Sequence, residues 1–471
     1  MLRLATSLLG AAILVIAAPA AAGSEVGPNR VVTVSSIAAL QSAADVAAAG
    51  DRIELTDGTY TTSGTIHIRR SGSASAPVVV AAAHTGAAQI RGSAGFSFDG
   101  GVDFVVIQGF RFTHSGGITV PVGSDHVRFT RNVVQLSGSV TNWMTVAGND
   151  AEVDHNTFQN KSTQGVFLQI SGPGDHNMAQ RPWIHHNYFH NHTFSGDNGG
   201  ESIRLGLSSR QLSSAFAVVE LNLFEHADGD SEAISVKSSD NTIRFNTLRN
   251  STGSIVLRHG NRNLVDGNLM LGSTAGIRFY ENDHVVINNV IQGGTGQIIA
   301  GSGDIGDDTD NGTEHARPDR VLVAFNTVVA NRTALLQVGQ GTDRLGPNQC
   351  TFANNIFVGG GSGGLIDVDE ATSTTWQGNI VWRGTGGNAP SSGLRVVNPA
   401  LSVDSGGLNR LTATSPAINA AAGSYPQVVQ DLDLQTRSGA KDVGADEFVS
   451  GGNQRRPLST SDVGPGASIT G

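Results

Sequence analysis

Short apolar segments built around an asparagine recur through most of the chain. Ten of these asparagines align with one another, namely Asn132, Asn156, Asn187, Asn222, Asn246, Asn268, Asn289, Asn326, Asn355 and Asn379. Their spacings run from 21 to 37 residues, and five of the nine lie between 21 and 24, which is typical of a solenoid with insertions. The segments are β-branched and are interrupted by Gly, Asn, Asp and Ser, without the i, i+3, i+4 stripe of a helical repeat. The pattern predicts an all-β fold, a right-handed parallel β-helix.

The recurrent asparagine is expected to occupy an inward-facing turn position. Asn tolerates left-handed backbone dihedrals better than most residues, and its amide can bond to the copies above and below it. The asparagines are therefore interpreted as structural rather than catalytic.

Both ends of the predicted solenoid carry segments that could cover its apolar cross-section. Residues 36–50 have apolar side chains at helical spacing and end in glycine, which predicts an N-terminal capping helix. The first strand is then expected at Arg52–Leu55. Residues 400–449 are predicted to form a closing segment, and residues 450–471, rich in Gly, Ser and Pro, to be disordered.

Composition supports one elongated domain over residues 23–449. The 471 residues include 61 glycines and only 6% aromatic residues, which suits a narrow solenoid better than a bulky globular core. Cys350 is the only cysteine, so no intrachain disulfide can form.

Residues 1–22 have the three parts of a secretory signal peptide. Arg3 is followed by an apolar run and then by the small residues Ala20 to Ala22. The apolar run is shorter than the roughly 20 residues that a membrane span needs. We therefore expect a secreted or periplasmic protein without a membrane partner.

Four cations follow apolar residues in similar segments of the middle third, namely Arg204, Lys237, Arg258 and Arg278. If they stack on successive turns about 4.8 Å apart, they form a column of positive charge roughly 15 Å long, the reach of about three sugar units. The net charge of −10 does not argue against this, because binding depends on the local field. The expected partner is a linear anionic polysaccharide and not a nucleic acid, and the oligomeric state is not predicted.

Lys237 stands out because the chain has only three lysines among its 30 cations. A lysine can lose its proton and act as a base, whereas an arginine cannot. From its position alone, Lys237 could equally be a solvated surface cation. Asp230, Glu232 and Asn198 precede it and could group oxygen ligands around a divalent ion such as calcium. The acids could instead neutralise neighbouring arginines. Asp230 and Glu232 share one strand face but Lys237 has the opposite parity, so these three residues can meet only if a bend or bulge lies between them.

These segments resemble polysaccharide lyase family 6, which contains alginate lyases and the dermatan sulfate lyase chondroitinase B. The resemblance rests on Asn198-Gly-Gly-Glu-Ser-Ile-Arg204, on Asp230 to Ser238, on Leu257-Arg258-His-Gly260 and on Gly276-Ile-Arg278. It implies that Asn198, Asp230 and Glu232 bind calcium, that Lys237 is the base and that Arg258 is the acid. The family commonly has Glu where this chain has Asp230, so the requirement for calcium stays open.

The chemistry that the resemblance implies is β-elimination from a 4-linked uronide, in which a base removes the C5 proton and the C4 oxygen leaves. Arg204 and Arg278 are assigned to substrate carboxylates, since an arginine fork matches a carboxylate. His259 and Tyr280 are secondary candidates for substrate binding. Since guanidinium stays protonated in proteins, a water could deliver the final proton in place of Arg258.

Alginate is favoured over dermatan sulfate, because a sulfated substrate should need a second basic cluster and only Arg262 lies near. Two other function classes stay open. A non-catalytic polysaccharide-binding β-helix would need the cations but not the acids, and a glycoside hydrolase would need a carboxylate pair, which Asp230 and Glu232 could imitate.

Two further groups are expected to be structural. Neighbouring residues of a strand face opposite ways, so His185, His186, His190 and His192 are not expected to bind zinc together. The acidic residues 304–312 lack the ligand pattern of a calcium loop and are interpreted as a solvated loop at the rim of the groove.

Overall fold

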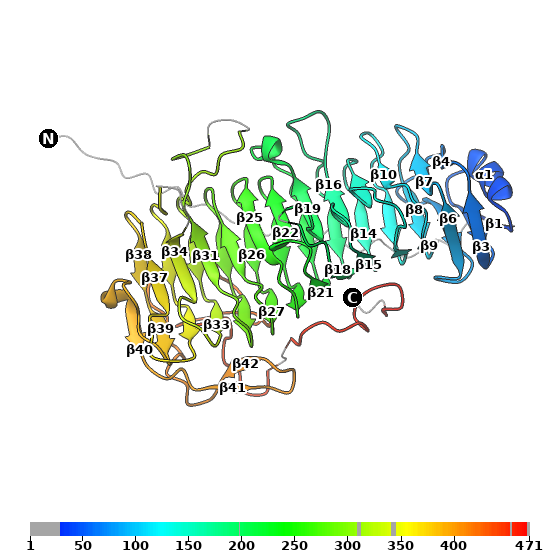
Figure 1. Cartoon of the computed structure of the whole chain (residues 1–471). Helices are drawn as coiled ribbons and strands as arrows, with labels where there is room; N and C mark the ends of the chain where they lie inside the picture. The colour runs from blue at the N-terminus through cyan, green and yellow to red at the C-terminus, as the bar shows by residue number, and fades with distance from the viewer. Residues whose placement is uncertain (1–28, 197, 309–311, 341–344, 453–454, 469–471) are drawn as a thin grey trace.

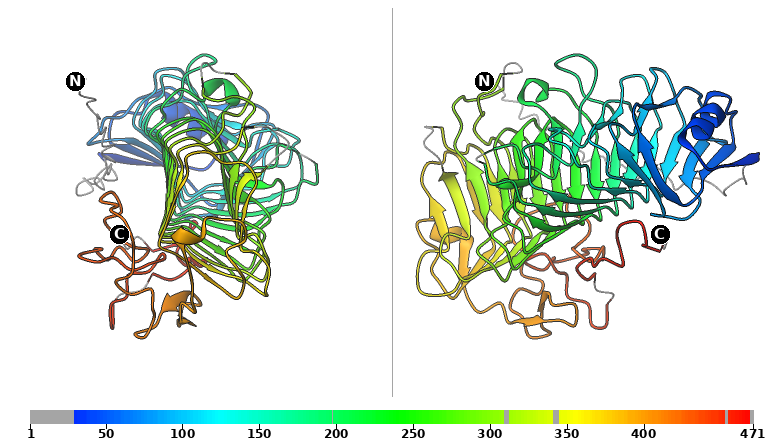
Figure 2. Two further views of the ribbon diagram at one scale, coloured as in Figure 1. Left: turned by 90° about the vertical axis from the view of Figure 1, so that its left-hand side faces the viewer. Right: turned by 45° about the vertical axis from the view of Figure 1, so that its right-hand side comes forward.

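The computed structural model describes residues 29–196, 198–308, 312–340, 345–452 and 455–468. In these residues the chain winds into an elongated coil whose turns are bonded side by side (Figure 1). Each full turn contributes one strand to each of three parallel sheets, called here sheets A, B and C, with 14, 14 and 12 strands in the described residues. Seen along the long axis, the sheets enclose a continuous narrow core (Figure 2, left). The predicted parallel β-helix is confirmed.

Sheet A consists of β1 (Arg30–Val34), β2 (Asp51–Leu55), β5 (Val78–Ala82), β8 (Val105–Gln108), β11 (Arg128–Thr130), β14 (Glu152–Asp154), β17 (Trp183–His185), β20 (Val218–Glu220), β23 (Thr242–Arg244), β26 (Leu264–Asp266), β29 (Val285–Ile287), β32 (Leu322–Ala324), β35 (Thr351–Ala353) and β38 (Thr375–Gln377). Sheet B consists of β3 (Gly58–Thr62), β6 (Ala88–Gly92), β9 (Arg111–Phe112), β12 (Val133–Val134), β15 (Thr157–Lys161), β18 (Tyr188–His192), β21 (Leu223–Ala227), β24 (Thr247–Arg249), β27 (Leu269–Leu271), β30 (Val290–Gln292), β33 (Thr327–Val329), β36 (Ile356–Val358), β39 (Asn379–Trp382) and β40 (Leu394–Val396). Sheet C consists of β4 (Ile66–Ile68), β7 (Phe96–Phe98), β10 (Ile118–Val120), β13 (Met144–Val146), β16 (Leu168–Ile170), β19 (Ile203–Gly206), β22 (Glu232–Lys237), β25 (Ser254–His259), β28 (Ile277–Phe279), β31 (Ile298–Gly301), β34 (Leu336–Gln340) and β37 (Ile366–Val368).

The ten aligned asparagines form an unbroken buried ladder at the corner between sheets A and B. In each step the side-chain oxygen of one asparagine accepts bonds from the backbone and side-chain nitrogens of the asparagine one turn earlier, at 2.9 to 3.1 Å. All ten are fully buried. Because a buried amide costs free energy unless its groups are bonded, each asparagine depends on the turns above and below it.

The left-handed backbone position of this corner belongs to the residue before each asparagine. Arg131, His186 and Phe245 are examples, with φ between 52° and 58°. The expectation that the asparagine itself takes this conformation is therefore wrong. The left-handed residue turns its side chain away from the core, while the asparagine that follows it points inward.

The N-terminal end is covered by α1 (Ile37–Asp45), the predicted capping helix. Ser36 caps it by accepting a bond from the Ala39 backbone nitrogen at 3.1 Å, and Leu40 is buried against the core. The helix ends at Asp45, before the predicted Gly50, and β1 precedes it, so Arg52 does not begin the first strand. No helix in the described part of the chain is both long and apolar enough to cross a membrane. The predicted signal peptide, residues 1–22, lies outside the described residues.

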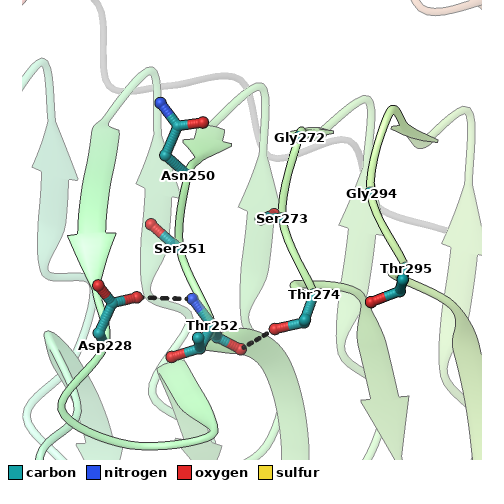
Figure 3. Close-up of a pocket in the computed structure, with 9 residues that line it drawn as sticks. All are labelled: Asp228, Asn250, Ser251, Thr252, Gly272, Ser273, Thr274, Gly294 and Thr295. Atoms are coloured by element: carbon teal, nitrogen blue, oxygen red, sulfur yellow. Dashed lines mark hydrogen bonds between the residues drawn. The ribbon is translucent and has the colours of Figure 1, made fainter.

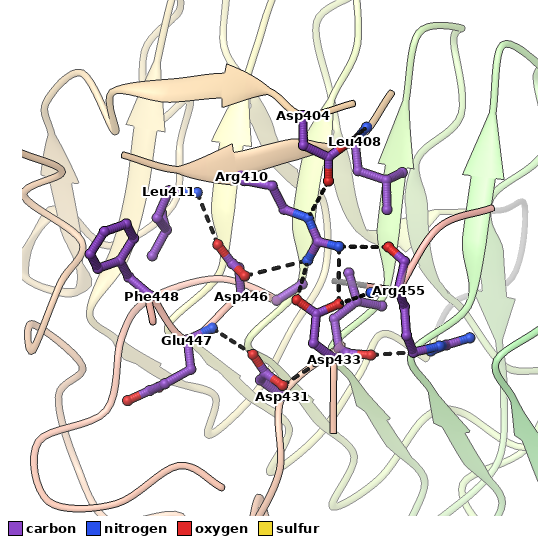
Figure 4. Close-up of polar contacts among 12 residues, drawn as sticks. Asp404, Leu408, Arg410, Leu411, Asp431, Asp433, Asp446, Glu447, Phe448 and Arg455 are labelled. Atoms are coloured by element: carbon purple, nitrogen blue, oxygen red, sulfur yellow. Dashed lines mark hydrogen bonds and ion pairs between the residues drawn. The ribbon is translucent and has the colours of Figure 1, made fainter. Parts of the chain in front are cut away.

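The closing segment, residues 400–449, includes the antiparallel pair β41 (Leu401–Val403) and β42 (Asn409–Leu411). It folds back over the outer side of the coil, where residues such as Val428 and Leu432 bury apolar side chains of sheets A and B (Figure 2). Arg410 holds this segment together through ion pairs with Asp404, Asp433 and Asp446 (Figure 4).

Residues 455–468 are ordered against the coil, so the prediction of a disordered tail fails for them. Arg455 places its guanidinium 4.2 Å from the Phe245 ring centroid, and Arg131 donates to the backbone oxygens of Pro465 and Ala467 at 2.8 and 2.9 Å. The outward left-handed residues of the asparagine corner thus form the docking surface for the tail. Gly, Ser and Pro composition alone did not reveal these partners.

We expect Asn246→Ala to lower the free energy of unfolding by about 2 to 4 kcal/mol, because it leaves several buried donors and acceptors unpaired. Thermal or urea unfolding measures the loss. The control is Asn388→Ala, which removes two hydrogen bonds to Val368 from an exposed asparagine. If both substitutions lower the free energy of unfolding equally, a buried ladder asparagine contributes no more to stability than an exposed one.

Candidate active site

The register of sheet C does not place the four predicted cations in one row. Arg204 aligns, through one residue on each of β22 and β25, with Arg278. Lys237 lies in the next outward row, where it aligns with Gly206 on one side and His259 on the other. The prediction of a single column of charge is therefore wrong, because spacing along the chain does not fix the register when extra residues are inserted.

Two irregularities in the pairing of β22 with β25 bring the site residues together. The register shifts between Glu232 and Ile234, and again between Val236 and Lys237. The second shift leaves Arg258 as an extra residue in β25, so it does not continue the regular alternation of the strand. A bulge was required for the acids and Lys237 to meet, and the register shift after Glu232 supplies it.

Glu232 links the two arginines that follow it. Its Oε1 accepts hydrogen bonds from Arg258 Nη1 and from Arg278 Nη2, both at 2.9 Å. The side chain is buried, and its Oε2 has no hydrogen-bond partner in the described residues. Glu232 therefore neutralises neighbouring arginines, which was the alternative to metal binding in the sequence analysis. Its second oxygen is left free for a further ligand.

Asp230 shapes the loop that carries Asn198. Its Oδ2 accepts from the backbone nitrogens of Gly199 and Gly200 at 2.8 and 3.4 Å, and its Oδ1 accepts from the Glu232 nitrogen at 3.2 Å. A Cβ on Gly200 would lie 1.9 Å from the Gly229 oxygen, so only glycine fits there. Asn198 lies exposed at the outer end of this loop.

Glu201 is a site residue to which the sequence analysis assigned no role of its own. It is buried, its Oε1 lies 3.6 Å from Arg204 Nη1, and its Oε2 has no partner among the described residues. Burial raises the pKa of its carboxyl above the ordinary value. Its place directly after two glycines was visible in the sequence, but its burial beside Lys237 was not.

Lys237 is a buried amine without an ion pair in the described part of the chain. Burial lowers the pKa of Lys237, the nearby carboxylates of Glu201 and Glu232 oppose that shift, and Arg258 and Arg204 reinforce it. Desolvation is the larger cause of the lowered pKa, and repulsion by the two arginines is the smaller one. Lys237 can therefore lose its proton more readily than a surface lysine.

Arg204 is oriented by Gln169, one turn earlier on sheet C. Its Nε donates to Gln169 Oε1 at 2.6 Å, while Gln169 Nε2 donates to the backbone oxygens of Ile170, Arg204 and Gly206 at 2.6 to 3.2 Å. The Arg204 guanidinium is thus held over the same outward face as Lys237.

His259 and Tyr280, the two secondary candidates, pack against a histidine from a distant loop. His259 is 1% exposed, lies 3.3 Å from Glu281 Oε1 through its Nδ1, and stacks on His315 with 4.7 Å between ring centroids. Tyr280 is half-buried and contacts the same His315 ring at 4.3 Å. Burial, with help from neighbouring cations, lowers the pKa of His259 to about 3, so this ring is neutral. His259 therefore packs beneath the site residues as a buried support. His315, which the sequence analysis did not name, contacts both His259 and Tyr280.

The loop that carries His315 forms one wall of the site. It leaves sheet C after β31 and lies back over the preceding turns, where Asn261 and Asn282 donate to Asp308 and Asp307 at 3.1 and 2.6 Å. Burial and the neighbouring Asp308 raise the pKa of Glu281, beneath this loop, to about 10. The loop rises above the sheets at the upper edge of Figure 1. Asp307 and Asp308 therefore dock this loop, while residues 309–311 of the predicted solvated loop lie outside the described residues.

The histidine-rich segment makes separate contacts. His185 and His186 bond to each other with 2.8 Å between their Nδ1 atoms, although neighbouring strand residues were expected to face opposite ways. His185 also pairs with Glu152, His186 stacks on His155, and His192 donates from Nε2 to the Gly165 oxygen at 2.8 Å. Glu152, Asp154 and His185 do lie close enough to share a cation, but Arg128 already pairs with both acids.

The candidate metal ligands offer the hard oxygen donors that calcium prefers. The free Oε2 atoms of Glu201 and Glu232 are buried acceptors without a partner in the described residues, which fits a cation at this place. Glu201, Asp230 and Glu232 do not belong to the described acid and histidine groups whose ligand atoms all lie within 4.8 Å of one another. An ion here would therefore have to draw these carboxylates closer together.

Several solved structures share this fold. The alginate lyase AlyGC of polysaccharide lyase family 6 has a TM-score of 0.72 and 23% identity, over 91% of this chain and 59% of its own length. A mannuronic acid-specific family 6 lyase from human gut microbiota has a TM-score of 0.68 and 25% identity, over 78% of this chain and 91% of its own. The family 6 lyase from Pseudopedobacter saltans has a TM-score of 0.68 and 19% identity, over 93% of this chain and 100% of its own. The chain thus spans only about three fifths of AlyGC.

No curated protein matches the chain. The profile of the chondroitinase B family matches residues 34–354, which is more than half of the sequence and includes all of the residues placed in the site above. The chain therefore belongs to the chondroitinase B family, polysaccharide lyase family 6.

Proposed function

We propose that this protein is a polysaccharide lyase that cleaves unsulfated 4-linked polyuronides, with alginate as substrate, by β-elimination. The observation that carries the proposal is Lys237, a buried amine of lowered pKa without an ion pair in the described residues, beside the Arg258–Glu232–Arg278 group. A hydrolase needs two carboxylates across the scissile bond and has no use for this lysine.

Lys237 acts as the base. Its neutral amine takes the proton from C5, the electron pair forms the C4–C5 double bond, and the bond from C4 to the glycosidic oxygen breaks. Arg258 donates a hydrogen bond to the departing oxygen and stabilises its charge. Since guanidinium keeps its proton, a water molecule supplies the proton that the leaving group needs, and the hydroxide so formed takes the C5 proton back from Lys237 to restore the neutral amine and the water. The products are a 4,5-unsaturated uronate end and a new free chain end.

The substrate carboxylates are bound by Arg204 and Arg278. Gln169 holds the first guanidinium and Glu232 the second, so both are oriented before substrate arrives. Arg278 also lies 5.9 Å from the Tyr280 ring centroid, which limits its movement further.

Calcium is proposed as the cofactor, held by Asn198, Asp230 and Glu232. When bound, it would neutralise the uronate carboxylate and so make the C5 proton more acidic. Asp230 already accepts three backbone bonds, so we infer a site weaker than one with a longer, freer carboxylate.

Dermatan sulfate is the second candidate, because the matching family profile is that of chondroitinase B. The contacts of Arg262 favour alginate. Arg262 forms a two-bond pair with Asp240 at 2.7 Å, so it is not free to bind a sulfate group.

The decisive experiment measures the ultraviolet absorbance of the C4–C5 double bond when purified protein meets alginate or dermatan sulfate. We expect a rise with alginate, and a loss of at least about 100-fold in rate for Lys237→Ala, because a positioned base contributes 10²-fold or more. Arg395→Ala, a change of equal charge on sheet B, is the control and should keep full activity. New reducing ends without absorbance would establish a hydrolase, and binding without cleavage a non-catalytic protein.

The pH profile tests the role of Lys237. Glu201 raises the pKa of Lys237, so Glu201→Gln should lower it and move the acidic limb of kcat/KM to lower pH. Glu225→Gln, on sheet B, is the matched control and should leave the limb unchanged. A limb that does not move in Glu201→Gln would contradict the assignment of Lys237 as the titrating base.

Removal of calcium by a chelator should lower the rate on alginate at least about tenfold, and added calcium should restore it. Calorimetric titration with calcium alone should show binding that Glu232→Gln abolishes. Full activity in chelator, together with no calcium binding, would show that the arginines alone neutralise the carboxylate.

A further inference from the structure

A hollow of about 320 Å³ continues the site beyond Arg278, toward the C-terminal turns. It begins at Ser231, directly before Glu232, and extends over the outward face of sheet C to Arg332. Its floor follows one row of the register, in which Val256, Arg278 and Ile299 align on β25, β28 and β31. The hollow therefore adjoins the candidate active site through Arg278.

Two polar atoms of residues that line this hollow have no partner within the described residues. They are Arg278 Nε, a donor, and Gln297 Oε1, an acceptor. Gln297 is held in place because its Nε2 donates to Gln337 Oε1 at 2.9 Å. Since buried polar groups are normally bonded, a donor and an acceptor left free together indicate a ligand with both kinds of group.

Arg332 supplies a fixed cation at the far end of the hollow. Its Nε donates to the Thr333 backbone oxygen at 2.9 Å and its Nη1 to the Thr295 backbone oxygen at 2.8 Å. No acid pairs with it in the described part of the chain, whereas surface arginines such as Arg181 and Arg320 do have acidic partners. A guanidinium that is oriented by carbonyls and not neutralised is suited to bind a carboxylate.

The remaining surface of the hollow suits a sugar ring. Val256 and Ile299 offer an apolar floor on either side of Arg278. Three hydroxyl residues on successive turns, Thr252, Thr274 and Thr295, border this hollow and also line a second hollow of about 440 Å³, whose lining is drawn in Figure 3. Apolar floor, hydroxyl border and cation together match the faces, hydroxyls and carboxylate of a uronate.

The spacing places this group two sugar units away from Arg278. Arg332 lies in the turn that leads into β34, and β34 is two rungs from β28. Two rungs correspond to about 10 Å, the length of about two sugar units.

We propose that this hollow is a distal subsite of the groove, in which Arg332 binds the carboxylate of a uronate two units beyond the one at Arg278, and Gln297 accepts a bond from a sugar hydroxyl. The proposal rests on the proposed function, since it assumes a polyuronide in the groove. It makes the enzyme sensitive to substrate length toward its C-terminal turns, because a shorter oligosaccharide cannot reach Arg332.

The test measures binding of unsulfated alginate oligosaccharides, from disaccharide to hexasaccharide, by calorimetry in a Lys237→Ala background that does not cleave them. Adding Arg332→Ala should weaken binding of the longer oligosaccharides about tenfold, the effect of one charged hydrogen-bonded contact, and leave the shortest unchanged. Arg395→Ala is again the control, because it also removes an arginine that donates to a backbone carbonyl. In the enzyme with Lys237 intact, Arg332→Ala should raise KM for long chains and leave kcat unchanged.

Equal affinity of the Arg332→Ala and parent proteins at every length would overturn the subsite while leaving the proposed function in place. A uniform loss at all lengths, with a lower midpoint of thermal unfolding, would overturn it in favour of a structural role for Arg332. If the Lys237→Ala parent binds no polyuronide of any length, the proposed function fails and the subsite with it.

Discussion

Parallel stacking of turns is the constraint on which the rest of this structure depends. Each interior strand of sheets A, B and C bonds to the strand one turn before and one turn after, so a residue in one turn fixes its neighbours by register and not by distance along the chain. The asparagine ladder makes this register hard to change, because each amide is buried and is satisfied only by its copies. A slip of one residue would bury the outward face and expose the core.

Function enters where this regularity is broken. The two register shifts between β22 and β25 release Arg258 from the alternation and let it share Glu232 Oε1 with Arg278. The result is a group with more positive than negative charge, beside the buried amine of Lys237. Burial raises the energy of a charged amine, and the scaffold supplies that burial because β22 lies in the middle of sheet C.

The two sides of the groove are built differently. On one side, the loop with His315 lies over the preceding turns of the coil. Asparagine side chains of those turns bond to its acids, and its His315 ring stacks on His259. On the other, small hydroxyl residues border the hollow that ends at Arg332. A loop on one side and an open polar border on the other suit a polysaccharide that lies along the coil axis. Its carboxylates would then meet cations at intervals of whole turns.

The sequence alone determined the architecture and most of the residue types of the site. The asparagine spacing and β-branched segments required stacked turns, and the motifs around Asn198, Lys237 and Arg258 pointed to the family, because such patterns are local in the chain. Tertiary structure decided which residues meet. Register shifts split the expected column of cations, and the 455–468 tail docked on Arg131 and Phe245. Glu201 lay within a recognised motif but its burial was not visible there, while His315 and Arg332 came to the site or its extension from segments without an obvious signal. The physical reason is that burial, register and contacts between distant loops depend on three-dimensional stacking, which local composition and periodicity do not encode.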